Sequence, residues 1–163
     1  MPDEGMLPFG KVFQFGIVVR DMDAAIAYYE SLGIGPFKER QGVGATERTV
    51  HGRPADDMRL RVSTASMGPV QIELMQPVAG QSIPAEYLER HGEGINHLAF
   101  TTADCQAVVR AMRARGFDVI TSGKIPGGGE FVYFDTDKTG GVVFEVVQPP
   151  PPSQQVSSEQ NRV

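Results

Sequence analysis

Gln14-Phe-Gly-Ile-Val-Val-Arg-Asp-Met-Asp-Ala-Ala-Ile-Ala-Tyr-Tyr-Glu-Ser-Leu-Gly33 decides the fold, because the chain contains a second version of this stretch. The second version runs from His97 to Gly116, and its two ends lie at one constant offset from the first (97 − 14 = 116 − 33 = 83). A similar short motif ends each half, Ile-Glu-Leu-Met-Gln-Pro at 72–77 and Phe-Glu-Val-Val-Gln-Pro at 144–149. An internal repeat of this kind predicts two equivalent halves.

The repeated stretch has the pattern of a β-strand followed by an α-helix. Residues 12–19 are rich in Phe, Ile and Val, which favour a strand. Asp21 is a typical helix N-cap, apolar residues then recur at helical spacing, and Gly33 is typical of the position after a helix. In the second half, the same reasoning predicts a strand over 95–101 and a helix over 104–115.

Further strands are predicted in both halves, at 35–41, 58–66 and 69–76 and at 117–121, 130–135 and 142–148. The polar, glycine-containing stretch 42–57 is predicted to be a long loop. The sequence therefore predicts an α+β fold in which two tandem βαβββ modules form a curved mixed sheet around a metal-binding cleft. The predicted segments are an N-terminal extension (1–10), a first module (11–77), a linker with a short helix after Ser82 (78–94), a second module (95–149) and a disordered, proline-rich tail (150–163).

Composition describes an ordinary globular protein and excludes several functional classes. The chain has 163 residues, of which 40% are hydrophobic and 21% charged. A net charge of −5 argues against nucleic acid as a partner, because nucleic-acid binding needs a basic surface. We expect no membrane-spanning segment and no signal peptide. The single cysteine fits a cytoplasmic location.

The alignment of the two halves brings out four side chains that can bind a divalent metal ion. It pairs Gln14 with His97 and Glu73 with Glu145. If equivalent strands face a common cleft, these four side chains converge there, since alternate strand residues share a face. One imidazole nitrogen and three oxygens suit Zn, Co, Ni, Mn or Fe(II). Alternatively, Gln14 only hydrogen-bonds a water or the substrate, and the two glutamates form a solvent-facing row.

The same motifs resemble the vicinal oxygen chelate superfamily, which includes glyoxalase I, methylmalonyl-CoA epimerase, extradiol dioxygenases and bleomycin resistance proteins. The resemblance rests on residues 15–23, 72–77, 92–100 and 140–148 and covers about residues 11–149. It implies that Gln14, Glu73, His97 and Glu145 bind the metal. The stretch 86–100 is most similar to methylmalonyl-CoA epimerases, whereas the order Gln, Glu, His, Glu is more similar to glyoxalase I.

The resemblance implies an enzyme that abstracts a proton next to a carbonyl, with Glu145 as the base and Glu73 as its symmetric alternative. The substrate expected is a 2-oxo acid, an acyl thioester or a hemithioacetal, and a homodimer is implied. An epimerase is the first choice and a glyoxalase I-type lyase the second. A non-catalytic binding or resistance protein stays open. A ring-cleaving dioxygenase is disfavoured, because it normally needs two histidines and one carboxylate around Fe(II).

Other polar residues carry weaker predictions. Arg59, Arg61 and Ser63 alternate along one predicted strand and could bind an acidic substrate, or they could form an exposed edge. Arg48 and Arg53 are further candidates for contacts to the phosphates of a CoA thioester. His51 and His91 are predicted to lie on the surface, although His51 could reach the mouth of the cleft. Cys105 is predicted to pack in the interior.

Overall fold

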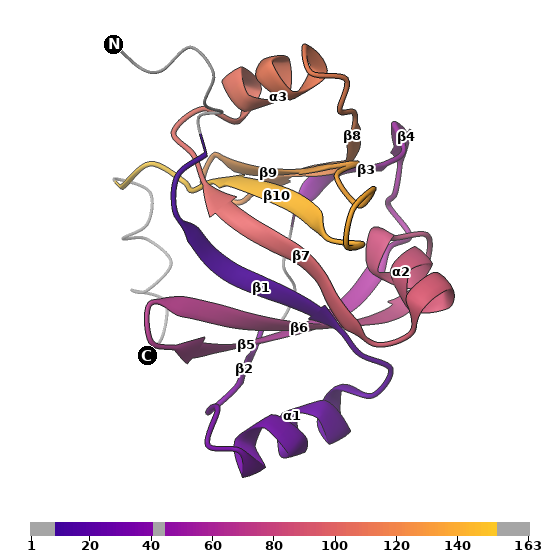
Figure 1. The fold of residues 1–163 in the computed structure, drawn as a ribbon, viewed down its shortest axis with the longest axis vertical. Helices are drawn as coiled ribbons and strands as arrows, with labels where there is room; N and C mark the ends of the chain where they lie inside the picture. Colours follow the sequence, from indigo (N-terminus) through magenta and orange to yellow (C-terminus); the bar gives the residue numbers. More distant parts are fainter. Residues whose placement is uncertain (1–8, 41–44, 153–163) are drawn as a thin grey trace.

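In the computed structural model, which describes residues 9–40 and 45–152, ten strands form one strongly curved sheet (Figure 1). The strand order in the described part of the chain is β2-β5-β6-β1-β7-β10-β9-β8-β3-β4. The strands are β1 (Val12–Val18), β2 (Lys38–Glu39), β3 (Thr46–Val50), β4 (Arg53–Pro54), β5 (Arg59–Met67), β6 (Val70–Ala79), β7 (Gly94–Thr101), β8 (Val119–Ile125), β9 (Gly129–Phe134) and β10 (Val143–Gln148). The helices are α1 (Met22–Ser31), α2 (Ile83–His91) and α3 (Cys105–Arg113).

The sheet repeats one arrangement about its centre, which confirms the predicted α+β fold. β1 pairs in parallel with β6, and β7 pairs in parallel with β10. β5 then pairs antiparallel with β6, and β9 pairs antiparallel with β10, at equivalent places in the two halves. The halves meet where β1 and β7 run antiparallel, with Gly16 opposite His97. The first strand of each sequence repeat therefore lies at the middle of the sheet.

Helices α1 and α3 cover the outer side of the curve at its two ends (Figure 1). Each helix begins at an aspartate whose side chain accepts a hydrogen bond from a backbone N–H in the first turn, Asp21 for α1 and Asp104 for α3. Ile72 and Leu74 of β6 pack in the cluster beneath α1, and Val146 of β10 packs in the cluster beneath α3. Residues between these outward-facing positions must point to the inner side of the sheet.

The prediction that 42–57 is a loop is wrong for much of that stretch. Residues 46–50 form β3 and residues 53–54 form β4, and β3 pairs with β8 of the other half, with Val50 opposite Thr121. This hairpin lies at one edge of the sheet, where side chains are largely exposed and need no apolar alternation. Sequence periodicity therefore gives no signal for it. Residues 41–44 lie outside the described residues.

Smaller differences concern lengths and ends. The strand predicted at 35–41 is only two residues long, β2, and the strand predicted at 117–121 lies at 119–125. The linker helix is confirmed as α2, which begins at the N-cap Ser82. The tail prediction concerns residues 150–163, of which 153–163 lie outside the described residues. Among the helices described, none has the length and apolar character needed to cross a membrane.

Candidate active site

The curvature of the sheet brings Gln14, Glu73, His97 and Glu145 together on its inner side. All four are buried, and the exposed fraction of the His97 side chain is 0%. His97 Nε2 lies 3.2 Å from Glu145 Oε2 and 3.6 Å from Glu73 Oε2. Gln14 Nε2 lies 3.4 Å from Glu73 Oε1. The four residues that the repeat pairs in sequence therefore form one cluster.

Strand alternation explains why both glutamates face inward. Glu73 lies between Ile72 and Leu74, which pack beneath α1, and Glu145 precedes Val146, which packs beneath α3. Since successive side chains of a strand point to opposite faces, packing the apolar residues outward turns the carboxylates inward. The alternative of a solvent-facing row does not describe these glutamates, because both are less than one-tenth exposed.

His97 is held in place by a close approach of backbone from the other half. Gly16 lies directly opposite His97 in the sheet. A Cβ atom at position 16 would lie 1.9 Å from His97 Cε1 and 2.2 Å from His97 Nδ1. The imidazole therefore occupies the space that the Cβ atom of any other residue at position 16 would need. The glycine in the first repeat is therefore required by the histidine in the second.

Tyr133 of β9 is a site residue that sequence analysis missed. Its hydroxyl lies 3.4 Å from His97 Nδ1, and the two rings are in edge contact. A hydrogen bond between this hydroxyl and Glu145 also lowers the pKa of that carboxyl, in opposition to burial. Tyr133 lies opposite Glu145 where β9 pairs with β10. Only this pairing could have indicated from the sequence that Tyr133 belongs to the site.

The cluster opens into a cavity of about 400 Å³, which we call the first cavity. Its apolar walls include Met58, Leu60 and Phe131. Its basic residues are Arg40, Arg48 and Arg59. Arg40 Nη1 lies 3.6 Å from Glu73 Oε1, and Arg48 donates a hydrogen bond to the carbonyl of Met58. Arg40 was not singled out in the sequence, because it belongs to no repeated motif.

The three residues predicted to bind substrate do not share one location. Arg59 lines the first cavity. Arg61 instead pairs with Asp23 and Glu39, at 2.9 Å each. The register of β5 against β6 shifts between Arg59 and Leu60, and such an irregularity changes the face to which a side chain points. Ser63 is fully buried and is absent from the described lining of the cavity.

Burial controls the proton affinities of the cluster. It raises the pKa of Glu73 from 4.5 to about 7, although the Arg40 guanidinium acts in the opposite direction. Burial, reinforced by the charge of Glu73, raises the pKa of Glu145 well above its usual value. Burial lowers the pKa of His97 to about 3. In the metal-free protein at neutral pH, His97 is therefore neutral, and burial favours the protonated form of Glu145.

These shifts predict how the stability of the metal-free protein depends on pH above 6.5. His97 is neutral in the folded chain, and in the unfolded chain it loses its remaining charge within about one pH unit above its ordinary pKa of 6.5, so it adds only a small slope of opposite sign. A carboxyl with a raised folded pKa stabilises the fold below about 4.5, and this stabilisation is lost as pH rises towards the folded pKa. For each carboxyl that stays protonated in the folded chain but is ionised in the unfolded chain, the free energy of unfolding falls by about 1.4 kcal/mol per pH unit.

We therefore expect the free energy of unfolding, measured with urea in the presence of a chelator, to fall between pH 6.5 and 8. Glu145→Gln removes one of the two carboxyls, so its slope should be clearly smaller than that of the wild type. A wild-type stability that is flat or rises over this interval would contradict the assignment, as would an unchanged slope in the variant.

The donor set fits a divalent metal ion. His97 Nε2 and Glu145 Oε2 are buried and have no hydrogen-bond partner among the described residues. Donor atoms around an ion at about 2.0–2.2 Å lie roughly 2.8–3.6 Å apart, which matches the contacts at His97. In the described part of the chain, however, no three His, Cys, Asp or Glu side chains form a ready-made metal cluster.

Comparison with known proteins decides the family. The sequence profile described as "Glyoxalase/Bleomycin resistance protein/Dioxygenase superfamily" matches residues 13–134, three quarters of the chain. The chain belongs to the glyoxalase/bleomycin resistance protein/dioxygenase superfamily. This confirms the resemblance found in the repeated motifs. The match covers Gln14, Glu73, His97 and Tyr133 and ends before β10, which carries Glu145.

Proteins of known structure share the fold at low sequence identity. Methylmalonyl-CoA epimerase from Mycobacterium tuberculosis matches with a TM-score of 0.68 at 23% identity, over 96% of this chain and 97% of the epimerase. A variant of the Streptomyces coelicolor methylmalonyl-CoA epimerase, in complex with 2-nitronate-propionyl-CoA, matches with a TM-score of 0.66 at 21% identity, over 88% and 99%. The Bacillus subtilis protein YqjC is 23% identical over 137 residues, which are 82% of this chain and 89% of YqjC.

Proposed function

We propose that this superfamily member is a divalent-metal-dependent isomerase, of the methylmalonyl-CoA epimerase type, that moves a proton on the carbon next to a carbonyl. The observation that carries the proposal is the pair of buried carboxylates, Glu73 and Glu145, on either side of His97 Nε2. Epimerisation needs one group to remove a proton and another to return it on the opposite face of the same carbon. Two symmetric carboxylates meet that need.

Unequal proton affinities suit the pair to this task. The charge of Glu73 contributes to the raised pKa of Glu145, so the two carboxyls share protons and titrate apart. Glu145 acts as the base in this proposal, since a carboxylate with high proton affinity is a strong base once ionised. Glu73 exchanges a proton with the opposite face of the same carbon. Arg40 lies beside Glu73 and favours its ionised form. Because Arg40 also lines the cavity, a molecule bound there would change the proton affinity of Glu73.

The metal ion would be held by His97, Glu73 and Glu145, with Gln14 as the fourth candidate. When bound, it supplies a positive charge beside the substrate carbonyl and so acidifies the adjacent C–H. Gln14 donates a hydrogen bond of 2.6 Å to Gln71 Oε1, which fixes the orientation of its amide. His97 can bind an ion through Nε2 only as the tautomer with the proton on Nδ1, for which the Tyr133 oxygen is the nearby acceptor.

The first cavity favours an anionic substrate with an apolar part. Arg40, Arg48 and Arg59 provide positive charge at its wall, while Met58, Leu60 and Phe131 provide apolar surface. An acyl-CoA thioester combines these properties, and the Streptomyces coelicolor epimerase variant is in complex with a CoA compound, 2-nitronate-propionyl-CoA. The basic wall of the cavity is therefore built from Arg40, which directly follows β2, from Arg48 of β3 and from Arg59 of β5.

The decisive experiment is solvent deuterium exchange followed by NMR. Protein loaded in turn with Zn, Co, Ni, Mn or Fe(II) is incubated in D₂O with acyl thioesters, 2-oxo acids and a hemithioacetal of glutathione. Loss of the C–H signal next to the carbonyl of a thioester supports the epimerase. Conversion of the hemithioacetal alone would assign glyoxalase-type chemistry. Tight binding without exchange, for every metal and substrate, would replace the proposal with a binding protein.

Tyr133→Phe is expected to weaken metal binding about tenfold. The change removes only the hydroxyl that faces His97 Nδ1, and losing such an outer partner typically costs 10–100-fold in affinity, roughly. Calorimetric titration with Zn measures the effect, and the visible spectrum of the Co-loaded protein reports the geometry. Tyr28→Phe, on the exposed face of α1, is the matched control. Wild-type affinity in Tyr133→Phe would mean that the hydroxyl does not orient the histidine.

A further inference from the structure

A second cavity, of about 170 Å³, lies beside the first and has no part in the proposed reaction. It is formed by α2, by the turn after β3, and by β7 and the segment that joins β9 to β10. Its polar lining includes His51, Glu86, Arg90, Asn96, Asp135 and Asp137. Ile83 lines both cavities and so forms part of the wall between them.

The buried amide of Asn96 is the feature of this cavity that calls for a ligand. β7 has one extra residue here, because Gly16 pairs with His97 while Ile17 pairs with Ile95. The Asn96 side chain lines the second cavity and is 0% exposed. Neither its Nδ2 nor its Oδ1 has a hydrogen-bond partner among the described residues. Leaving an amide unpaired in the interior is costly, so a donor and an acceptor are needed in the cavity.

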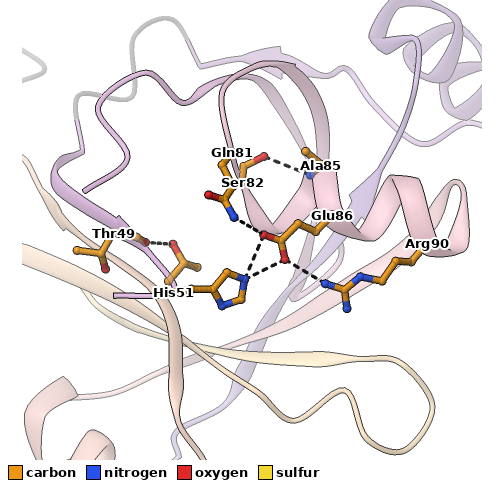
Figure 2. Close-up of polar contacts among 8 residues, drawn as sticks. Thr49, His51, Gln81, Ser82, Ala85, Glu86 and Arg90 are labelled. Atoms are coloured by element: carbon orange, nitrogen blue, oxygen red, sulfur yellow. Dashed lines mark hydrogen bonds and ion pairs between the residues drawn. The ribbon is translucent and has the colours of Figure 1, made fainter. Parts of the chain in front are cut away.

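The charges around the cavity favour a cationic group. Figure 2 shows Glu86 between His51, Gln81 and Arg90, with contacts of 2.9, 3.1 and 3.2 Å. This network engages the Arg90 guanidinium. The carboxylates of Asp135 and Asp137 add further negative charge, which is offset at Asp135 by Lys138 at 3.3 Å. Asp137 forms no ion pair among the described residues.

We propose that the second cavity binds a small compound with an ammonium group, an α-amino acid or a simple amine. The ammonium group would donate to Asn96 Oδ1 and lie in the field of Asp137, and the rings of Tyr87 and His91 would provide an aromatic wall. An α-amino acid also presents a carboxylate, which can accept from Asn96 Nδ2. It therefore satisfies both atoms of the amide, whereas a simple amine satisfies one.

The size of the cavity limits the ligand. Since one water takes up about 30 Å³ of liquid, the cavity has room for roughly six non-hydrogen atoms. Glycine, alanine and serine are of this size, and larger amino acids would have to extend past the exposed Asp137. A bound ligand would also contact Ile83, so it could alter the wall of the first cavity.

Protein-observed ¹H–¹⁵N NMR tests the proposal without depending on any catalytic activity. The full chain is titrated to roughly 10 mM with glycine, alanine and serine, with ethylamine, and with acetate as the compound that lacks an ammonium group. Saturable shifts of the Asn96 side-chain amide and of α2 support the site. Shifts with the amino acids but not ethylamine identify the zwitterion, and shifts with both identify the amine.

Two variants and one control complete the test. Asp137→Asn, which changes an exposed residue, should weaken binding about tenfold, because it removes a charge from the ammonium group. Asn96→Leu keeps the side-chain volume and should abolish binding. Glu89→Gln, on the exposed face of α2, removes a charge outside the cavity and should bind as the wild type does. Absence of shifts with every amine and amino acid, equal shifts with acetate, or unchanged binding in both variants would overturn the proposal and leave a water as the partner of Asn96.

Discussion

Glu145→Gln is expected to lower the rate of solvent deuterium exchange by about a thousandfold, within the range typical of losing a general base. Glutamine keeps the shape of the side chain but cannot take up the substrate proton. Because Glu145 Oε2 is buried and has no hydrogen-bond partner among the described residues, the change disrupts no existing hydrogen bond of that atom. The fold should therefore survive, and the circular dichroism spectrum should match that of the wild type.

Glu130→Gln is the matched control for this prediction. Glu130 is also a buried glutamate in the second half of the sheet, but it pairs with Lys124 and Gln106 and lies outside the lining of the first cavity. Its exchange rate should stay within about twofold of the wild type. If Glu145→Gln exchanged as fast as Glu130→Gln, the role of base would pass to Glu73, and Glu73→Gln would then have to show the large loss.

Gly16→Ala is expected to reduce metal affinity by more than about a hundredfold and to destabilise the fold by about 1–3 kcal/mol. The new methyl group would overlap the His97 ring, whose nearest atom is 1.9 Å from the Cβ position. His97 is fully buried, so the ring can move only by displacing its neighbours. Gly16 has no positive φ angle, so steric overlap alone carries this prediction.

Calorimetric titration with Zn and urea unfolding measure these two effects separately. Gly94→Ala is the control, because a Cβ there would meet only the end of a side chain, Tyr87 Oη, at 3.1 Å. It should keep the metal affinity of the wild type. Gly16→Ala with normal stability and normal affinity would show that the imidazole does not occupy the position over Gly16.

The four-residue cluster could be predicted from the sequence because its members sit in repeated local patterns. Period-two alternation places Glu73 and Glu145 on one face of their strands, and the duplication relates Gln14 to His97. Tyr133 and Arg40 could not be found in this way. Both contact the cluster across the sheet or across the cavity, and no local pattern encodes contacts between strands that are far apart in sequence.

Irregularities in strand pairing account for most of what sequence analysis missed. Arg59 and Arg61 are separated by the register shift at Leu60, and Asn96 owes its place in the second cavity to the extra residue in β7. Such bulges depend on the partner strand, so alternation within a single strand cannot predict them. The hairpin of β3 and β4 was missed for a related reason, since it completes the sheet of the other half.

The sequence by itself determined that the protein has two equivalent halves, where the three helices and the central strands β1, β6, β7 and β10 lie, and that Glu73 and Glu145 share the face opposite their apolar neighbours. These properties depend on residues that are near neighbours in the chain, where alternation, capping and repetition act directly. Only the tertiary structure decided which basic residues reach the first cavity, that Tyr133 contacts His97, and that Asn96 lies unpaired in a second cavity. Those properties depend on how distant strands register against one another, because a shift of one residue in pairing changes which side chains meet.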